Sequence, residues 1–556
     1  MVSRREFCRI PASAAAALLA AQRGNAQQRS AIQNSPTEWS YESGKRYADP
    51  FQEVELDVVF TLPTGERHRV PAFWAGESTW RVRYAPPVAG RYTFRTVCSD
   101  TSNRDLHAQA GALSVSPYSG ANPLNQHGAL RVSDDRRHFA HADGTPFFWL
   151  GDTWWMGLCR RLSWPDDFRT LTADRVRKGF TVVQIVAGLY PDMPAFDPRG
   201  ENEAGFPWEK DYKTIRPAYF DMADLRIAHL VENGIAPCVV GCWGYFLPQM
   251  GLEKMRRHWR YLVARWGCYP AIWCLAGEAT MPFYLSNSKQ RDVEMQRHGW
   301  TEIARYVRSI DPLRHPITLH PSQSARDSVE DVSVLDFDML QTGHNDRRSA
   351  RPTIEALNRS LASEPTMPAL VGEVCYEGIQ EASREEVQRF MFWACLLSGA
   401  AGHTYGANGI WQVNTPERPY GLSPHGHSWG GPPWNVAAQL PGSGQLGRAK
   451  RLLGGYSWQR MQPAIDLLET HWTPDDYWQP FAAQIPGEAV IAFSPSGTKA
   501  LRFRNVPSFA KRAYLFNPSD GSRVPLGRIE ADSSGVWKAP EFPIFRDWVM
   551  VLDGQG

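Results

Sequence analysis

Eight short apolar runs are the feature that most constrains how this chain can fold. Seven of them are followed by a segment with helical periodicity. Each run has the length and the continuous apolar character of a strand buried in a parallel sheet. The runs lie at residues 147–151, 181–186, 235–240, 271–275, 316–319, 337–340, 369–371 and 402–405. This repetition of strand and helix predicts an α/β fold, a (β/α)8 TIM barrel over residues 127–456.

The segments on either side of the predicted barrel have a different pattern. Residues 37–118 alternate apolar and polar positions between Gly- and Pro-containing turns, which predicts an N-terminal β-sandwich. Residues 470–554 predict a second all-β domain of the sandwich type. The polar stretch 27–36 is expected to be disordered. The chain is therefore expected to have three domains.

Two glutamates each follow an apolar run and a glycine. Glu278 ends the sequence Ala276-Gly277-Glu278, and Glu373 follows Gly372. Active sites of (β/α)8 barrels are built at the carboxyl ends of the strands, so both side chains are expected at one mouth. A facing pair of carboxylates is the minimum apparatus for cleaving a glycosidic bond. Glu377 is the main competitor of Glu373, but it lies farther past its strand.

Further polar and aromatic side chains occur at or just past the predicted strand ends. They are expected to contact a sugar or to orient the carboxylates. These candidates are Asp152, Trp154, Trp155, Gln184, His320, Gln341, His344, Tyr376, His403, Tyr405 and Trp411.

Composition excludes several other function classes. The net charge is +2, from 60 basic and 58 acidic residues, which favours neither nucleic acid nor an anionic membrane. The 22 Trp and 19 Tyr residues suit stacking on sugar rings. The sequence has no C-x-x-C pair. His425-Gly426-His427 resembles a metal-binding pair, but it lies in the loop after the eighth strand, so neither metal nor cofactor is expected.

The N-terminus has the pattern of an export signal. Arg4-Arg5 precede a short apolar region, and a small-residue cleavage site ends near Ala26. Residues 1–26 are therefore predicted to be a twin-arginine-like signal peptide of a bacterial periplasmic or secreted protein. The apolar region is too short to span a bilayer, and no membrane span is expected elsewhere.

With these residues placed, the chain resembles the apiosidase-like glycoside hydrolase family. The resemblance is carried by residues 148–155, 179–184, 260–278, 338–344, 372–378 and 402–411. It implies a barrel flanked by an N-terminal β-sandwich and by a C-terminal domain like those described as collagen-binding. Relatives often have Asp where this chain has Glu278, and Pro where it has Val374.

The resemblance implies an exported enzyme that cleaves a plant or microbial polysaccharide by a retaining mechanism. Glu278 would then be the general acid/base and Glu373 the nucleophile. Two alternatives stay open: an inverting glycosidase, and a non-catalytic carbohydrate- or matrix-binding protein on the same scaffold. The long loops after the second and eighth strands favour exo action, whereas the sugar, the linkage and the oligomeric state are left open.

Overall fold

The computed structural model describes residues 28–554, which form two compact units divided between Tyr118 and Ser119. The expected signal peptide at 1–26 lies outside the described residues. No helix in the described part of the chain is long and apolar enough to cross a membrane.

The N-terminal unit is a β-sandwich, as predicted. A five-stranded sheet in the order β1-β8-β7-β3-β4 packs on a three-stranded sheet in the order β2-β6-β5. Trp39 of the smaller sheet packs against Phe60 and Phe94 of the larger one, with ring centroids 5.8 and 5.2 Å apart. The elements are β1 (Gln28–Ile32), β2 (Thr37–Glu42), α1 (Pro50–Glu53), β3 (Leu56–Thr61), β4 (Arg67–Pro71), β5 (Phe73–Gly76), β6 (Thr79–Tyr84), β7 (Gly90–Cys98) and β8 (Ala110–Ser116).

The expectation that residues 27–36 are disordered is wrong for the described residues 28–36. Residues 28–32 form β1, which pairs in parallel with β8 along its whole length. The backbone hydrogen bonds of a sheet edge order a strand even where its side chains are polar, which composition alone does not reveal.

The second unit contains the predicted barrel. Eight parallel strands follow the order β16-β15-β14-β13-β12-β19-β18-β17. The first and last are joined by the backbone hydrogen bond from Asp336 to Ile317, so the barrel is nearly closed. The strands are β12 (Trp149–Thr153), β13 (Val182–Val186), β14 (Ala236–Val240), β15 (Ile272–Cys274), β16 (Ile317–Thr318), β17 (Asp338–Gln341), β18 (Ala369–Glu373) and β19 (Gly402–Tyr405).

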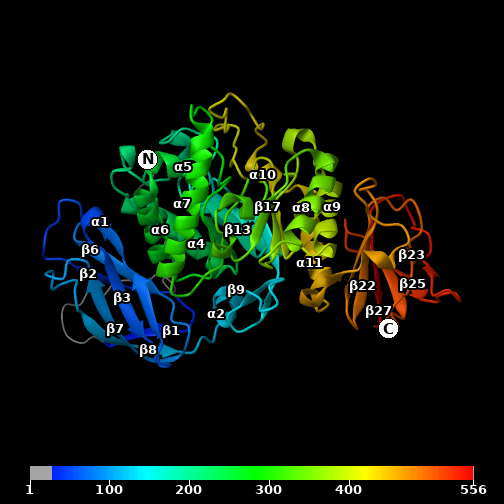
Figure 1. The fold of residues 1–556 in the computed structure, drawn as a ribbon, viewed down its shortest axis with the longest axis horizontal. Helices are drawn as coiled ribbons and strands as arrows, with labels where there is room; N and C mark the ends of the chain where they lie inside the picture. Colours follow the sequence, from blue (N-terminus) through cyan, green and yellow to red (C-terminus); the bar gives the residue numbers. More distant parts are fainter. Residues whose placement is uncertain (1–27, 555–556) are drawn as a thin grey trace, which may run out of the picture. The chain divides into compact units, whose positions relative to one another are not determined.

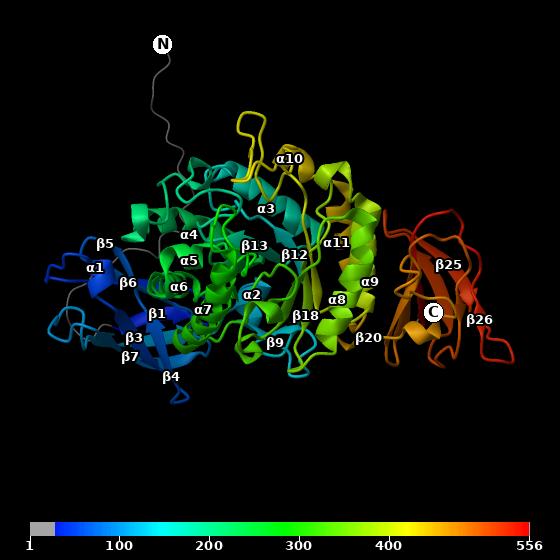
Figure 2. The ribbon, with the colours of Figure 1, turned by 45° about the horizontal axis from the view of Figure 1, so that its top comes forward.

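Helices surround these strands (Figures 1 and 2). The sequence of the first of them, α3, explains where that helix begins and ends. Asp166 and Asp167 occupy its first turn, where the helix dipole favours negative charge, and Gly179 ends it with a left-handed φ of 84°. The helices are α3 (Asp166–Lys178), α4 (Pro217–Glu232), α5 (Phe246–Met250), α6 (Leu252–Trp266), α7 (Lys289–Ile310), α8 (Ala350–Leu361), α9 (Glu385–Leu397), α10 (Trp434–Ala437) and α11 (Pro441–Leu453).

A short segment precedes the barrel in the second unit. It contains a helix and a three-stranded antiparallel sheet in the order β11-β10-β9. Its elements are α2 (Pro123–His127), β9 (Leu130–Val132), β10 (Phe139–His141) and β11 (Pro146–Phe147).

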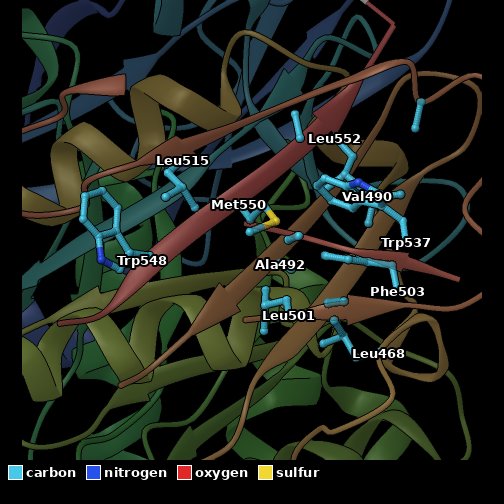
Figure 3. Packing of buried hydrophobic residues seen from close by; sticks show 14 residues of the cluster. Leu468, Val490, Ala492, Leu501, Phe503, Leu515, Trp537, Trp548, Met550 and Leu552 are labelled. Atoms are coloured by element: carbon cyan, nitrogen blue, oxygen red, sulfur yellow. The ribbon is translucent and has the colours of Figure 1, made fainter. Parts of the chain in front are cut away.

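The C-terminal β-domain belongs to the same unit as the barrel. Its six-stranded antiparallel sheet, in the order β20-β21-β22-β27-β24-β25, begins before the predicted residue 470. Trp537, Trp548 and Met550 lie in its apolar core (Figure 3). The strands β23 and β26 form a separate two-stranded sheet. The strands of the domain are β20 (Gln462–Pro463), β21 (Phe481–Ile485), β22 (Ala489–Ser494), β23 (Arg502–Phe503), β24 (Arg512–Phe516), β25 (Arg523–Arg528), β26 (Trp537–Lys538) and β27 (Trp548–Asp553).

The C-terminal domain is attached to helix α9 of the barrel. Arg389 makes a bidentate ion pair with Asp547, at 2.5 and 2.9 Å, and both side chains are buried. Phe390 of the same helix stacks on Trp478, with centroids 4.1 Å apart. Helix α9, which follows the Glu373 strand β18, is therefore anchored to the C-terminal domain.

Candidate active site

Glu278 and Glu373 lie at the carboxyl ends of two different barrel strands, β15 and β18. Glu373 is the last residue of β18, and Glu278 lies four residues past β15. The glycine before each is required by packing. A Cβ on Gly277 would lie 2.2 Å from the Trp243 ring, and one on Gly372 would lie 2.4 Å from the Met339 side chain.

Glu278 accepts two hydrogen bonds from uncharged donors. The indole Nε1 of Trp243 donates to its Oε2 at 3.2 Å, and Gln341 Nε2 donates to its Oε1 at 3.2 Å. Its backbone has a positive φ of 39°, a strained conformation of the kind found at functional sites. Burial, and then the negative charge of Glu373, raise the pKa of Glu278 above its ordinary value.

Glu373 has several more donors. His344 Nε2 lies 2.8 Å from its Oε1, and the Tyr376 hydroxyl donates to its Oε2. His320 Nε2 lies 3.1 Å from Oε2. Burial alone would raise the pKa of Glu373, but the two imidazoles hold it well below its ordinary value.

Gln341 joins the two carboxylates. Its Nε2 lies 3.2 Å from Glu278 Oε1 and 3.3 Å from Glu373 Oε1, so these oxygens are at most 6.5 Å apart, the sum of the two contacts. Because the two hydrogens of an amide nitrogen diverge by about 120°, oxygens that accept both are about 5.6 Å apart.

Aromatic rings support this pair from inside the mouth. The Trp155 indole donates to the Tyr376 hydroxyl at 3.1 Å. The same ring packs edge-on against His320 and Trp243, at 5.1 and 5.6 Å between centroids. Trp155 therefore contacts Trp243, which donates to Glu278, and also Tyr376 and His320, which contact Glu373.

The structure thus brings together seven of the predicted residues. Gln184 lies beneath them, where its Nε2 donates to the Gly372 carbonyl at 2.9 Å and so supports the backbone before Glu373. The seven are Glu278, Glu373, Trp155, His320, Gln341, His344 and Tyr376.

Three predicted residues face the surrounding helices instead of the mouth. Asp152 is fully buried and paired with Arg175 of α3 at 2.6 Å, and the Trp154 indole donates to Asp152 at 2.7 Å. Tyr405 donates to Glu377 and lies under the Arg175 guanidinium. Alternate residues of a strand point to opposite faces, and these side chains fall on the outer one.

The two remaining candidates also lie in packed surroundings. His403 is fully buried against Phe392 of α9, and burial lowers its pKa to about 3. Trp411 packs edge-on against Tyr420 in the loop after β19. Neither has a described contact with Glu278 or Glu373.

Glu377 occupies a separate environment from the carboxylate pair. It accepts hydrogen bonds from Tyr405 and from the Gly442 backbone N–H, and burial raises its pKa to about 7. It is held between β19 and α11, away from Gln341.

Sequence reasoning missed a group of residues in the long loops. Asp192 has a positive φ of 54°, accepts a hydrogen bond from Tyr284, and has a pKa raised by burial. Tyr284 stacks on His425 at 4.7 Å, and His427 packs against Trp429 at 4.4 Å. Trp429 in turn lies 6.3 Å from the His344 ring, which connects this group to the site.

Trp243 was also missed, although a signal for it was present. It lies three residues past the end of β14, and the other candidates were chosen because they lie at or just past a strand end.

Within residues 28–554, no group of three or more His, Cys, Asp and Glu side chains is arranged to hold a metal ion.

Comparison with known proteins places the barrel in a family. The profile described as apiosidase-like, catalytic domain, matches residues 133–460, and a domain of unknown function, DUF5060, matches residues 33–99. Among curated proteins, none matches the chain.

Solved structures share the fold. A glycoside hydrolase has 22% identity and a TM-score of 0.63, covering 78% of this chain and 98% of its own. A family 5 glycoside hydrolase from Bacteroides vulgatus has 23% identity and a TM-score of 0.65, covering 78% and 94%. A third protein, from the same organism and assigned to the glycoside hydrolases, has 15% identity and a TM-score of 0.68, covering 95% and 100%.

At these identities the structural likeness shows the fold alone, whereas the family profile spans more than half of the chain. The chain belongs to the apiosidase-like family, and its barrel is a glycoside hydrolase catalytic domain.

Proposed function

We propose that the chain hydrolyses glycosidic bonds with retention of configuration, with Glu373 as nucleophile and Glu278 as general acid/base. The observation that carries this proposal is the Gln341 bridge between two carboxylates whose pKa values are shifted in opposite directions. Retaining enzymes hold their carboxyl groups about 5–5.5 Å apart and inverting enzymes about 6.5–9.5 Å. The two contacts of Gln341 limit the oxygen separation to at most 6.5 Å, and ideal amide geometry gives about 5.6 Å, which supports the retaining arrangement.

The first step would use the two carboxylates in their favoured protonation states. The ionised Glu373 attacks the anomeric carbon, and the bond from that carbon to the leaving oxygen breaks. The proton of Glu278 passes to the leaving oxygen, which departs as a hydroxyl. The product is a glycosyl ester on Glu373.

The second step would reverse these roles. Glu278, now a carboxylate, takes a proton from a water molecule, whose oxygen attacks the anomeric carbon. The ester bond to Glu373 breaks, and the free sugar leaves with its original configuration. The imidazoles of His320 and His344 stabilise the carboxylate charge that Glu373 regains.

We propose a plant or microbial polysaccharide as the substrate, and export directed by residues 1–26. The aromatic side chains of the loops suit a sugar, because flat rings with polar edges stack on sugar faces. The opposed pKa shifts favour catalysis over binding alone, because binding a sugar does not require two neighbouring carboxyl groups whose pKa values differ.

The test is hydrolysis of a panel of aryl furanosides and pyranosides, with the anomer formed first identified by proton NMR. Wild type should release the retained anomer, and Glu278→Gln and Glu373→Gln should each lose nearly all activity. Glu377→Gln is the matched control, because it changes a buried glutamate outside the pair and should stay active. An inverted product, or activity that survives Glu373→Gln, would refute the proposed mechanism.

A further inference from the structure

The N-terminal sandwich has a sheet face that the barrel chemistry does not use. On the five-stranded sheet, the residues that point away from the sandwich core form rows across the strands (β3, β7 and β8 in Figure 1). One row runs from β4 to β1 in continuous register, through Arg67, Thr61, Thr93, Ala112 and Gln28. Its interior members have short side chains.

These short side chains leave a hollow of about 490 Å³ in the face. Its floor is formed by small residues of β3, β7 and β8. The guanidinium groups of Arg67, Arg91 and Arg95 line it. All three arginines are exposed, whereas the Phe94 side chain between the last two is buried in the sandwich core.

The three arginines are uncompensated. None of them has an acidic partner within 4.0 Å among residues 28–554. Arg69, on the same face, is different, because Asp57 lies 2.6 Å from its guanidinium. Strand geometry places Arg91 and Arg95 about 13 Å apart along β7. Arg67 is in register with Thr93, two strand spacings away, which puts it about 12 Å from each of them.

This pattern selects an anionic ligand over a neutral one. A guanidinium presents paired N–H donors that match a carboxylate, and such charge-assisted hydrogen bonds are among the stronger ones. No aromatic ring is exposed in the lining of the hollow, so it lacks the stacking surface that a neutral sugar would need. The spacing of the three charges suits an extended chain with repeated carboxylates.

We propose that this face of the N-terminal domain binds an anionic polysaccharide, a chain that carries carboxylates on its sugar residues. The occupant is a polysaccharide because the domain is joined to a glycoside hydrolase barrel. Binding a polymer to a domain of the same chain would raise the effective concentration of its glycosidic bonds at the barrel. The proposal does not depend on which bond the barrel cleaves.

The experiment measures binding of the full chain to polygalacturonate by isothermal titration calorimetry, with neutral galactan as the comparison. Wild type should bind polygalacturonate, more weakly as salt is added, and should not bind galactan. The variant Arg67→Gln/Arg91→Gln/Arg95→Gln should bind at least tenfold more weakly. The corresponding triple Arg→Lys variant, which keeps the charge, should recover part of the affinity.

Two controls separate this site from general charge and from the barrel. Arg512→Gln/Arg528→Gln/Lys538→Gln removes the same charge from exposed positions of the C-terminal domain and should bind normally. Glu373→Gln should also bind normally, so a failure of the proposed reaction would not affect this result. Equal binding by the Arg67 triple variant, binding of galactan, or binding of single-stranded RNA in place of polygalacturonate would overturn the proposal.

Discussion

Replacing Glu373 by Gln should change the titration of Glu278. The substitution keeps the shape of the side chain but removes a negative charge, and ideal amide geometry at Gln341 puts the Oε1 atoms of the two glutamates about 5.6 Å apart. Two unit charges at this separation interact by about 3 kcal/mol at an effective dielectric constant of about 20. Their repulsion favours the protonated form of Glu278 and raises its pKa. The pKa of Glu278 should therefore fall in the Glu373→Gln variant.

The assay is a pH titration followed by NMR on protein carrying ¹³C at the glutamate side-chain carboxyls. The Glu278 signal is assigned as the one that disappears in Glu278→Gln. Glu377→Gln serves as the control, since it alters a nearby buried glutamate and should leave the Glu278 midpoint in place. A Glu278 midpoint that is equal in wild type and in Glu373→Gln would refute the argument, because the two carboxylates could not then be close neighbours.

Three further predictions follow from the contacts around the site. Gln341→Leu removes a donor that lowers the pKa of Glu278, so the alkaline limb of kcat/KM should move to higher pH. Its kcat/KM should also fall by about 10²-fold, because the carboxylates lose their shared anchor. Asp192→Asn removes a negative charge that raises the pKa of Glu278, so the alkaline limb should move to lower pH; an unchanged pH profile would exclude this coupling. Asp547→Asn leaves Arg389 buried without its carboxylate, which should lower the free energy of unfolding by about 3–5 kcal/mol in urea denaturation, and Arg389→Met/Asp547→Leu should recover most of that loss.

The barrel could be predicted from the sequence because its strands are marked by a local signal. A run such as residues 369–371 is apolar at every position, and this occurs where both faces of a strand are buried. The strand ends then locate the mouth. This rule found His320, Gln341 and His344 as well as the two glutamates, although they are up to 95 residues apart, from 278 to 373.

The same rule could not tell which way a side chain points at a strand end. Asp152 and Gln184 both lie on strands near the mouth, yet Asp152 pairs with Arg175 on the helix side and Gln184 reaches Gly372. A shift of one residue reverses the face, and apolar runs carry no alternation from which to read it. Asp192 and Tyr284 were missed for another reason, because the conformation of a long loop depends on contacts that a local pattern does not contain.

The different roles proposed for the two glutamates arise from their neighbours and not from the residues themselves. Both are glutamates and both accept from Gln341, although Glu373 is buried and Glu278 is only partly buried. Glu373 also faces two imidazoles and a phenol, so its charge is compensated, whereas the other donor to Glu278 is the neutral indole of Trp243. Once Glu373 is ionised and compensated, its charge acts on Glu278 and favours a proton there. The Glu373 charge that His344 stabilises therefore raises the pKa of Glu278, whereas His320 also acts on Glu278 directly and lowers its pKa.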